Sequence, residues 1–207
     1  MLNSGIVASV WIVLGIAIAG RRYQRYRHTK QFCSELGASC SPTEKFSPLI
    51  NNYPLGLLLV IFGGYLIQLA PSSVLMIMVG ALIVVHGIGT WVAGYFPMGA
   101  DPYTKTSSFN CKVHSWVGSV MFLSLLIVEV LCLFISELSF DFKMLTTFSI
   151  FASMYFSYTL VKSFRHKTNL GTQQRLSYAA QLVWLSGLSF AVANVFYDDL
   201  YQYKVAF

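Results

Sequence analysis

Six apolar stretches, each long enough to cross the hydrocarbon core of a bilayer, dominate this chain. A spanning helix needs about 20 apolar residues, and only helices and closed barrels satisfy every backbone polar group within that core. The sequence therefore predicts an all-α polytopic membrane protein, a bundle of six transmembrane helices forming one transmembrane domain over residues 1–207. The expected helices are 2–20, 49–69, 74–95, 114–135, 145–164 and 176–196.

The composition excludes an ordinary soluble domain. Of the 207 residues, 56% are hydrophobic and only 11% are charged, whereas a soluble domain carries about 25% charged residues. The net charge of +6 would favour nucleic-acid binding in a soluble protein, but here the cations are concentrated in alternate loops. We therefore interpret the charge as membrane topology and predict no nucleic-acid partner.

The distribution of lysine and arginine predicts the orientation of the bundle. All of them except Lys143 and Lys204 lie in 21–48, 96–113 and 162–175. Cytoplasmic loops are enriched in these residues, so these three segments are expected in the cytoplasm and both termini outside it. The first segment begins with cations mixed with aromatic rings, Arg21 to Arg27. Such a segment favours contact with anionic membrane lipids.

Small residues recur along two of the expected helices. Gly80, Gly87 and Gly94 are seven residues apart, and Ser149 and Ser153 begin a row with a spacing of four. Rows of this kind let neighbouring helices approach closely and form hydrogen bonds. Both rows are expected to face the interior of the bundle as ordinary packing surfaces.

Four polar clusters lie in or beside the three basic segments. They are Ser34 to Ala38, Phe96-Pro97 with Asp101, His114 with Gly118, and Gly171 to Arg175. In this order they resemble the domain-of-unknown-function 998 family of small prokaryotic membrane proteins, although the spacing from Pro97 to Asp101 is longer than usual there. The resemblance covers roughly 30–196. It implies a helical fold in the cytoplasmic (inner) membrane of a prokaryote and no settled activity.

Glu35, Asp101, His114 and Arg175 are the candidate catalytic residues, because their loops are expected at one mouth of the bundle. An imidazole can move a proton near neutral pH, and a guanidinium can bind a phosphate or carboxylate with two hydrogen bonds. The alternative is structural. A carboxylate would pair with Arg175 to fasten the loops, and His114 would cap its own helix.

His86 and Glu129 are ionisable residues inside expected membrane helices. A charge at that depth costs several kcal/mol, so such residues are candidates for function. A proton relay between them is one interpretation, although their heights differ by roughly 10 Å at 1.5 Å per residue. The other is a neutral His86 bonded between helices and a protonated Glu129.

No cofactor and no metal site is predicted. Walker, G-x-G-x-x-G, G-x-S-x-G and H-E-x-x-H motifs are absent from the sequence, which argues against nucleotide-driven and common hydrolase functions. His28 and His166 share the predicted face with His114, but basic neighbours would repel a cation. Cys33, Cys40 and Cys111 are expected to stay reduced in the cytoplasm; with an inverted orientation, Cys33 and Cys40 become candidates for a disulfide.

Three functions therefore remain open. The first is an enzyme or binding protein for a lipid or other amphiphile at the cytoplasmic mouth. The second is a small transporter using His86 and Glu129. The third is an accessory protein whose polar clusters only hold its loops.

Overall fold

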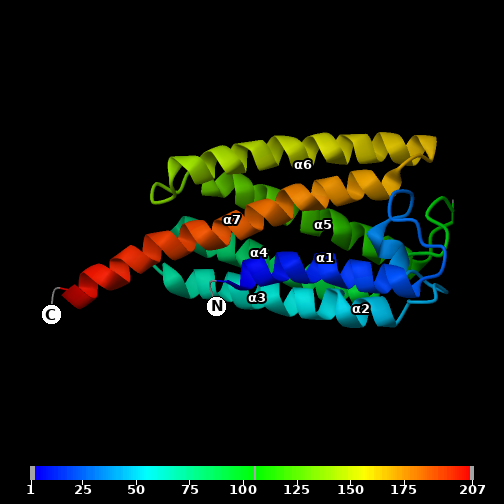
Figure 1. Ribbon diagram of the computed structural model, residues 1–207, viewed down its shortest axis with the longest axis horizontal. Helices are drawn as coiled ribbons and strands as arrows, with labels where there is room; N and C mark the ends of the chain where they lie inside the picture. The colour runs from blue at the N-terminus through cyan, green and yellow to red at the C-terminus, as the bar shows by residue number, and fades with distance from the viewer. Residues whose placement is uncertain (1–2, 105, 206–207) are drawn as a thin grey trace.

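The computed structural model describes residues 3–104 and 106–205, with side chains to residue 195 (Figure 1). All regular structure in these ranges is helical. The elements are α1 (Ser4–Arg22), the 3₁₀ turn η1 (Cys33–Gly37), α2 (Phe46–Ile50), α3 (Asn52–Leu69), α4 (Val74–Tyr95), α5 (Phe109–Cys132), α6 (Phe140–His166) and α7 (Leu170–Val205).

The predicted six-helix membrane fold is confirmed. Six helices in the described ranges are long and apolar enough to span a bilayer, with α2 and α3 together forming the second span. The largest differences in boundary are at α7, which begins six residues before and ends nine residues after the apolar run predicted. The helices α5 and α6 each begin five residues before the apolar runs predicted. Ser108 and Ser139 set these starts, because their hydroxyls accept hydrogen bonds from the backbone N–H groups of Cys111 and Phe142. Helix ends thus follow capping groups rather than hydrophobicity.

The second span is interrupted at Asn51. Pro54 has no N–H to donate to the carbonyl of Ile50, four residues earlier. The indole Nε1 of Trp11 in α1 donates to that carbonyl at 2.7 Å instead. A break within the membrane is tolerated when a neighbouring helix satisfies the freed backbone group, so α1 stabilises the junction between α2 and α3.

The glycine row of α4 packs against α3 as predicted. A Cβ on Gly80 would meet the carbonyl of Gly63, and a Cβ on Gly63 would meet the carbonyl of Gly80. Gly87 and Gly56 form the same reciprocal contact two turns away. With no side chain at these points, the backbones of α3 and α4 touch, which is the closest packing that two helices allow.

The three basic segments lie at one end of the bundle, here called the basic end. The backbone N–H of Ser39 donates to the carbonyl of Met98 at 2.9 Å, and that of Thr172 to the carbonyl of Thr29 at 3.1 Å. These bonds tie 23–45 to 96–108 and to the start of α7. Both described chain ends lie toward the opposite end (Figure 1).

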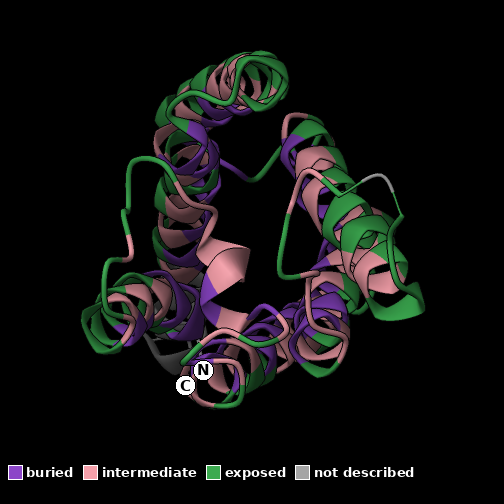
Figure 2. Cartoon of the chain, turned by 90° about the vertical axis from the view of Figure 1, so that its right-hand side faces the viewer, coloured by how far each residue is buried: buried purple, intermediate pink, exposed green. Residues whose placement is uncertain are grey.

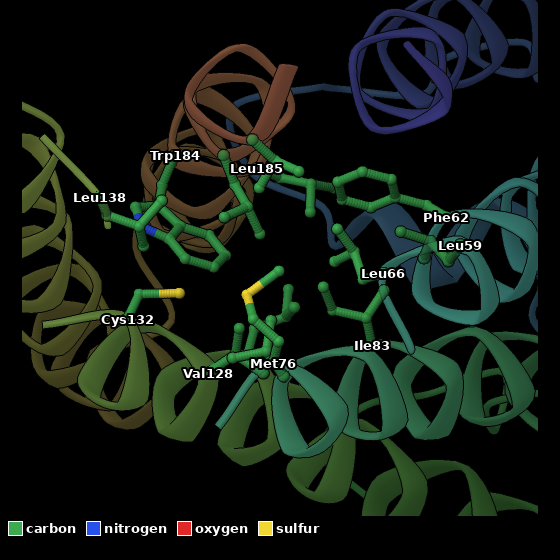
Figure 3. Close-up of a cluster of buried hydrophobic side chains, with 14 of the residues drawn as sticks. Leu59, Phe62, Leu66, Met76, Ile83, Val128, Cys132, Leu138, Trp184 and Leu185 are labelled. Atoms are coloured by element: carbon green, nitrogen blue, oxygen red, sulfur yellow. The ribbon is translucent and has the colours of Figure 1, made fainter. Parts of the chain in front are cut away.

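The hydrophobic core is a cluster of buried side chains (Figure 3), most of which lie in the half of the bundle away from the basic end. It is formed mainly by α3, α4, α5 and α7, with Ala8 of α1 and Phe142 of α6, and Phe62, Val79, Val128 and Trp184 are each fully buried. Figure 2, which looks onto the basic end, shows the helices standing in a ring. The core thus fills the bundle away from the basic end, and a cavity lies within the basic half.

Candidate functional site

A cavity of about 170 Å³ lies inside the basic half of the bundle. Its walls come from α1, η1, α2, α3, α4, α5 and α7. Polar groups and apolar side chains share this lining. The polar ones are Cys33, Ser34, Ser47, Asn51, Asn52, Thr90, His86, His114, Tyr178 and Gln181.

Two histidines line the cavity at different depths. Nδ1 of His86 donates to the carbonyl of Met121 at 2.9 Å. Nδ1 of His114 donates to the carbonyls of Ala93 at 3.1 Å and Phe96 at 2.9 Å. Because a carbonyl can only accept, the neutral form of each ring carries its proton on Nδ1 and leaves Nε2 as a hydrogen-bond acceptor.

The two imidazoles are held at different levels along α5. His114 lies seven residues before Met121 in α5, which corresponds to about 10 Å along the helix axis at 1.5 Å per residue. The rings therefore present two hydrogen-bond acceptors on a line running into the bundle. His114 also caps the carbonyl end of α4 rather than its own helix α5.

Three amide side chains add further polar groups to the wall. Asn52 donates to the carbonyl of Thr90 at 3.1 Å, and Gln181 donates to that of Phe122 at 3.5 Å. Asn51 is 4% exposed, and its Oδ1 has no hydrogen-bond partner among the described residues. A buried amide oxygen without a partner is rare in folded proteins, and this one packs against Gly15 of α1, although other atoms of Asn51 line the cavity.

The described residues that line the cavity include no Asp, Glu, Lys or Arg. The remaining wall is apolar, with Ile12, Ile16 and Leu55 on one side and Met121, Phe122 and Leu125 on the other. A charged group entering this site would lose water without gaining a counter-charge, which is costly in a low-dielectric interior. The lining therefore suits a polar but uncharged group attached to an apolar one.

Arg175 is engaged by the loop that precedes η1 and lies outside the cavity lining. Its guanidinium donates to the carbonyls of His28, Gln31 and Gly171 and to the hydroxyl of Tyr26. Gly171 has no room for a Cβ, which would meet the carbonyls of His28 and Gln31. Arg175 thus fastens 26–31 to α7 through backbone oxygens rather than through the carboxylate expected from the sequence.

Glu35 and Asp101 also serve their own loops. The Glu35 carboxylate accepts from the backbone N–H of Phe32 at 2.8 Å and from the side-chain amide of Gln31 at 3.0 Å. Asp101 is exposed and accepts from the backbone N–H of Tyr103 at 2.9 Å. No ion pair joins either carboxylate to Arg175 in the described part of the chain.

The four predicted site residues therefore occupy one end of the bundle but not one site. Of Glu35, Asp101, His114 and Arg175, only His114 is among the described residues that line the cavity. Glu35 and Arg175 stabilise the layer of loops above it. This layer is built from the motif segments themselves, because Gln174 accepts from the backbone N–H of Cys33 at 2.7 Å.

Burial shifts the pKa of the loop groups around the cavity. Burial raises the pKa of the Cys33 thiol to about 11, so the thiol stays protonated at neutral pH. Burial also raises the pKa of Tyr26, which keeps the phenol neutral beside Arg175. Loss of water contact lowers the pKa of His28, and the Arg175 guanidinium lowers it further.

Glu129 lies outside the cavity lining, in the interface between α5 and α6. Its Oε1 accepts from the hydroxyl of Ser149 at 2.7 Å, while Oε2 is buried without a partner among the described residues. His86 binds the carbonyl of Met121, eight residues before Glu129 and about 12 Å away along the helix. The structure therefore shows no contact between the two residues of the predicted relay in the part it describes.

Sequence reasoning missed the amides and the depth of the cavity. Asn51, Asn52 and Gln181 are uncharged, so they lack the high free-energy cost of a charge inside an apolar helix, and the sequence did not single them out as candidates for function. A stripe in α5 was nevertheless available as a signal, since His114, Gly118, Met121, Phe122 and Leu125 recur at helical spacing and all face the cavity. Uncharged polar residues in that stripe and in the neighbouring helices identify the site better than the charged residues do.

The residues present do not form a metal centre in the described ranges. No group of three His, Cys, Asp or Glu side chains comes together there. Cys33, Cys40, Cys111 and Cys132 are free thiols in the structure.

Comparison with known families gives a match over most of the chain. The family described as "Protein of unknown function (DUF998)" matches residues 6–191, which confirms the resemblance carried by the four polar clusters. No curated protein and no solved structure matched the chain.

Proposed function

Because this integral membrane protein belongs to the DUF998 family, whose description assigns no activity, we propose a function from its cavity: it binds an amphiphile with an uncharged polar head group. The head group occupies the cavity at the basic end. The observation that carries this proposal is a wall of hydrogen-bonding groups without formal charge, backed by apolar side chains.

The chemistry of the wall defines the ligand class. Acceptors at Nε2 of His86 and His114 suit hydroxyl or amide donors on a head group. Ligand sites are commonly apolar with a few convergent polar groups, and an anionic head group would find no cation in this wall.

Binding is favoured over catalysis and over transport by the surroundings of the cavity. The nearest thiol, Cys33, is protonated at neutral pH and so is a weak nucleophile. Beyond His86, the space toward the opposite end is occupied by fully buried core residues such as Ile83 and Val128, which supports a cavity that is closed toward that end rather than a continuous transport path. Glu129 then acts as a packing residue.

The orientation and the lipid contacts predicted from the sequence complete the proposal. The basic end faces the cytoplasm of a prokaryotic cell and both termini lie outside it, as the positive-inside rule favours. Arg21, Arg25 and Arg27 are exposed at this end, and anionic lipid head groups would hold that surface at the membrane.

The test compares an uncharged and an anionic amphiphile of the same chain length. Native mass spectrometry in detergent would measure binding of monooleoylglycerol and of oleoyl lysophosphatidate to the wild type and three variants. His86→Phe and His114→Phe should each weaken monooleoylglycerol binding about tenfold, the equivalent of one hydrogen bond of roughly 1.4 kcal/mol. Glu129→Gln keeps the acceptor for Ser149 and should bind like the wild type.

Two results would contradict the proposal. One is equal or tighter binding of the anionic amphiphile to the wild type. The other is loss of binding in Glu129→Gln with retention in both histidine variants, which would return the intramembrane carboxyl to the centre of the function. Thermal melting of each variant separates lost binding from lost folding.

A further inference from the structure

We propose that the amphiphile enters the cavity sideways from the bilayer, through a gap between the basic halves of α5 and α6. This gap, bordered by Gly118 and Phe122 of α5, Tyr178 of α7 and the facing part of α6, is called the portal below. The inference rests on the proposed function and adds the route and the place of the acyl chain.

The two helices pack together only in the half away from the basic end. In α5 the buried residues begin at Ser124, and every residue from Phe109 to Leu123 is exposed or half-buried. In α6 the last buried residue is Ser153, and every residue from 154 to His166 is exposed or half-buried. Among consecutive spans, α5 and α6 share the least extensive contact.

The cavity is open on the side where this contact is missing. Its lining comes from every membrane span except α6, within the part of the chain that the structure describes. Gly118 lines the cavity and is itself exposed, and a Cβ added there would meet no atom within 4 Å. Tyr178 also lines the cavity while 40% of its surface is exposed. The same residues therefore border both the cavity and the exterior of the bundle.

Contacts above and below give the portal a fixed frame. Toward the membrane centre, the hydrogen bond from Ser149 to Glu129 ties α6 to α5 at 2.7 Å. At the basic end, Tyr103 of the loop before α5 stacks on Phe164 of α6 with ring centroids 5.0 Å apart. Ser149 and Phe164 are 15 residues apart, so the frame is about 22 Å tall along α6.

The size of the cavity requires an exit for the acyl chain. About 170 Å³ accommodates a small head group but is below the 300–1,000 Å³ typical of sites that enclose a drug-sized ligand. Gly118 and Phe122 belong to the membrane-spanning part of α5, so the space outside the portal is hydrocarbon. An acyl chain can therefore stay in the bilayer while its head group reaches His86 and His114.

The experiment narrows the portal at a position where the fold leaves room. Gly118→Ala, Gly118→Leu and Gly118→Trp form a size series, and Gly64→Trp is the matched control. A Cβ at Gly64 also meets no atom within 4 Å, and Gly64 is not among the residues that line the cavity. The chain would be placed in phosphatidylcholine nanodiscs, and a fluorescent monoacylglycerol would report the rates of association and dissociation.

A lateral route predicts a graded kinetic effect. Gly118→Ala should behave like the wild type, Gly118→Leu should slow association severalfold, and Gly118→Trp should slow both association and dissociation at least tenfold. Gly64→Trp should change neither rate more than twofold, and all four variants should keep the melting temperature of the wild type.

Unchanged rates in Gly118→Trp, with binding intact, would overturn the portal and leave the proposed function standing. A tenfold effect in Gly64→Trp would likewise overturn it, because the slowing would then be independent of position. Absence of binding by the wild type would refute the proposed function itself, and the lateral route with it.

Discussion

At the scale of single residues, the charged side chains of this protein hold loops, and the uncharged polar ones line its cavity. Arg175 forms hydrogen bonds with three backbone carbonyls and one phenol. Its guanidinium also donates to Nδ1 of His28 at 3.3 Å. That bond needs an unprotonated Nδ1, so the loop before η1 depends on a neutral His28.

The packing of this loop should therefore weaken as the pH falls. The pKa of His28 is lowered in the folded chain, so the unfolded loop binds more protons below the usual histidine pKa of about 6.5. The contribution is complete above that pH and declines below it. Hydrogen–deuterium exchange of 23–31 should be faster at pH 5.5 than at pH 7.5, after correction for intrinsic rates.

His28→Gln should remove most of this pH dependence, whereas His166→Gln, at an exposed position, should retain it. Equal pH dependence in both variants would show that another group controls the loop.

At the scale of elements, the second span is broken where its neighbour can complete its hydrogen bonds. Pro54 frees the carbonyl of Ile50, and Trp11 satisfies it. One turn further along α1, Gly15 faces Asn51, and a Cβ on Gly15 would collide with the Asn51 side chain. The break therefore brings Asn51 and Asn52 into the cavity wall and keeps α1 close to it.

Trp11→Phe should destabilise this junction. The substitution leaves the Ile50 carbonyl without its indole donor on a surface that faces the bilayer, where no water replaces the bond, and a polar group without a partner costs about 1–3 kcal/mol. Trp116→Phe is the matched control, because Trp116 is 75% exposed. Unfolding of the reconstituted chain should show the loss for Trp11→Phe only; equal effects in the two variants would argue against a role for the Trp11 hydrogen bond.

At the scale of the whole molecule, a solid half and a hollow half divide the bundle. The buried core holds α3, α4, α5 and α7 together away from the basic end, and the reciprocal glycine contacts join α3 to α4 in both halves. At the basic end, a loop contact rather than helix packing joins α5 to α6. A molecule of this shape is suited to receiving a ligand from one leaflet of the membrane, and its orientation determines which leaflet that is.

Thiol labelling should establish that orientation. Cys40 is exposed at the basic end, so a membrane-impermeant maleimide should label it in inverted vesicles and not in intact spheroplasts. Ser136→Cys, introduced into a chain whose native cysteines are replaced, should show the opposite pattern because Ser136 is exposed at the other end. Labelling of both positions from one side would contradict the six-span topology.

The sequence by itself determined the six helices and the shared end of the three basic segments. Apolar length selects spanning helices, because the bilayer leaves the backbone no other way to satisfy its polar groups. Because each helix takes the chain across the membrane once, alternate loops then lie on the same side. The close helix contact at Gly80 and Gly87 was also predictable, because a residue without a side chain lets the backbone of a neighbouring helix approach.

Only the tertiary structure decided which polar residues share a site. Glu35, Asp101 and Arg175 were candidate catalytic residues because they are charged. In the structure their side chains form hydrogen bonds with the backbone of nearby loops. His86 and His114 lie on different helices, and their common cavity depends on how α4 and α5 turn toward each other. Rotation of helices and the gap between α5 and α6 arise from packing between residues distant in sequence, which no local pattern records.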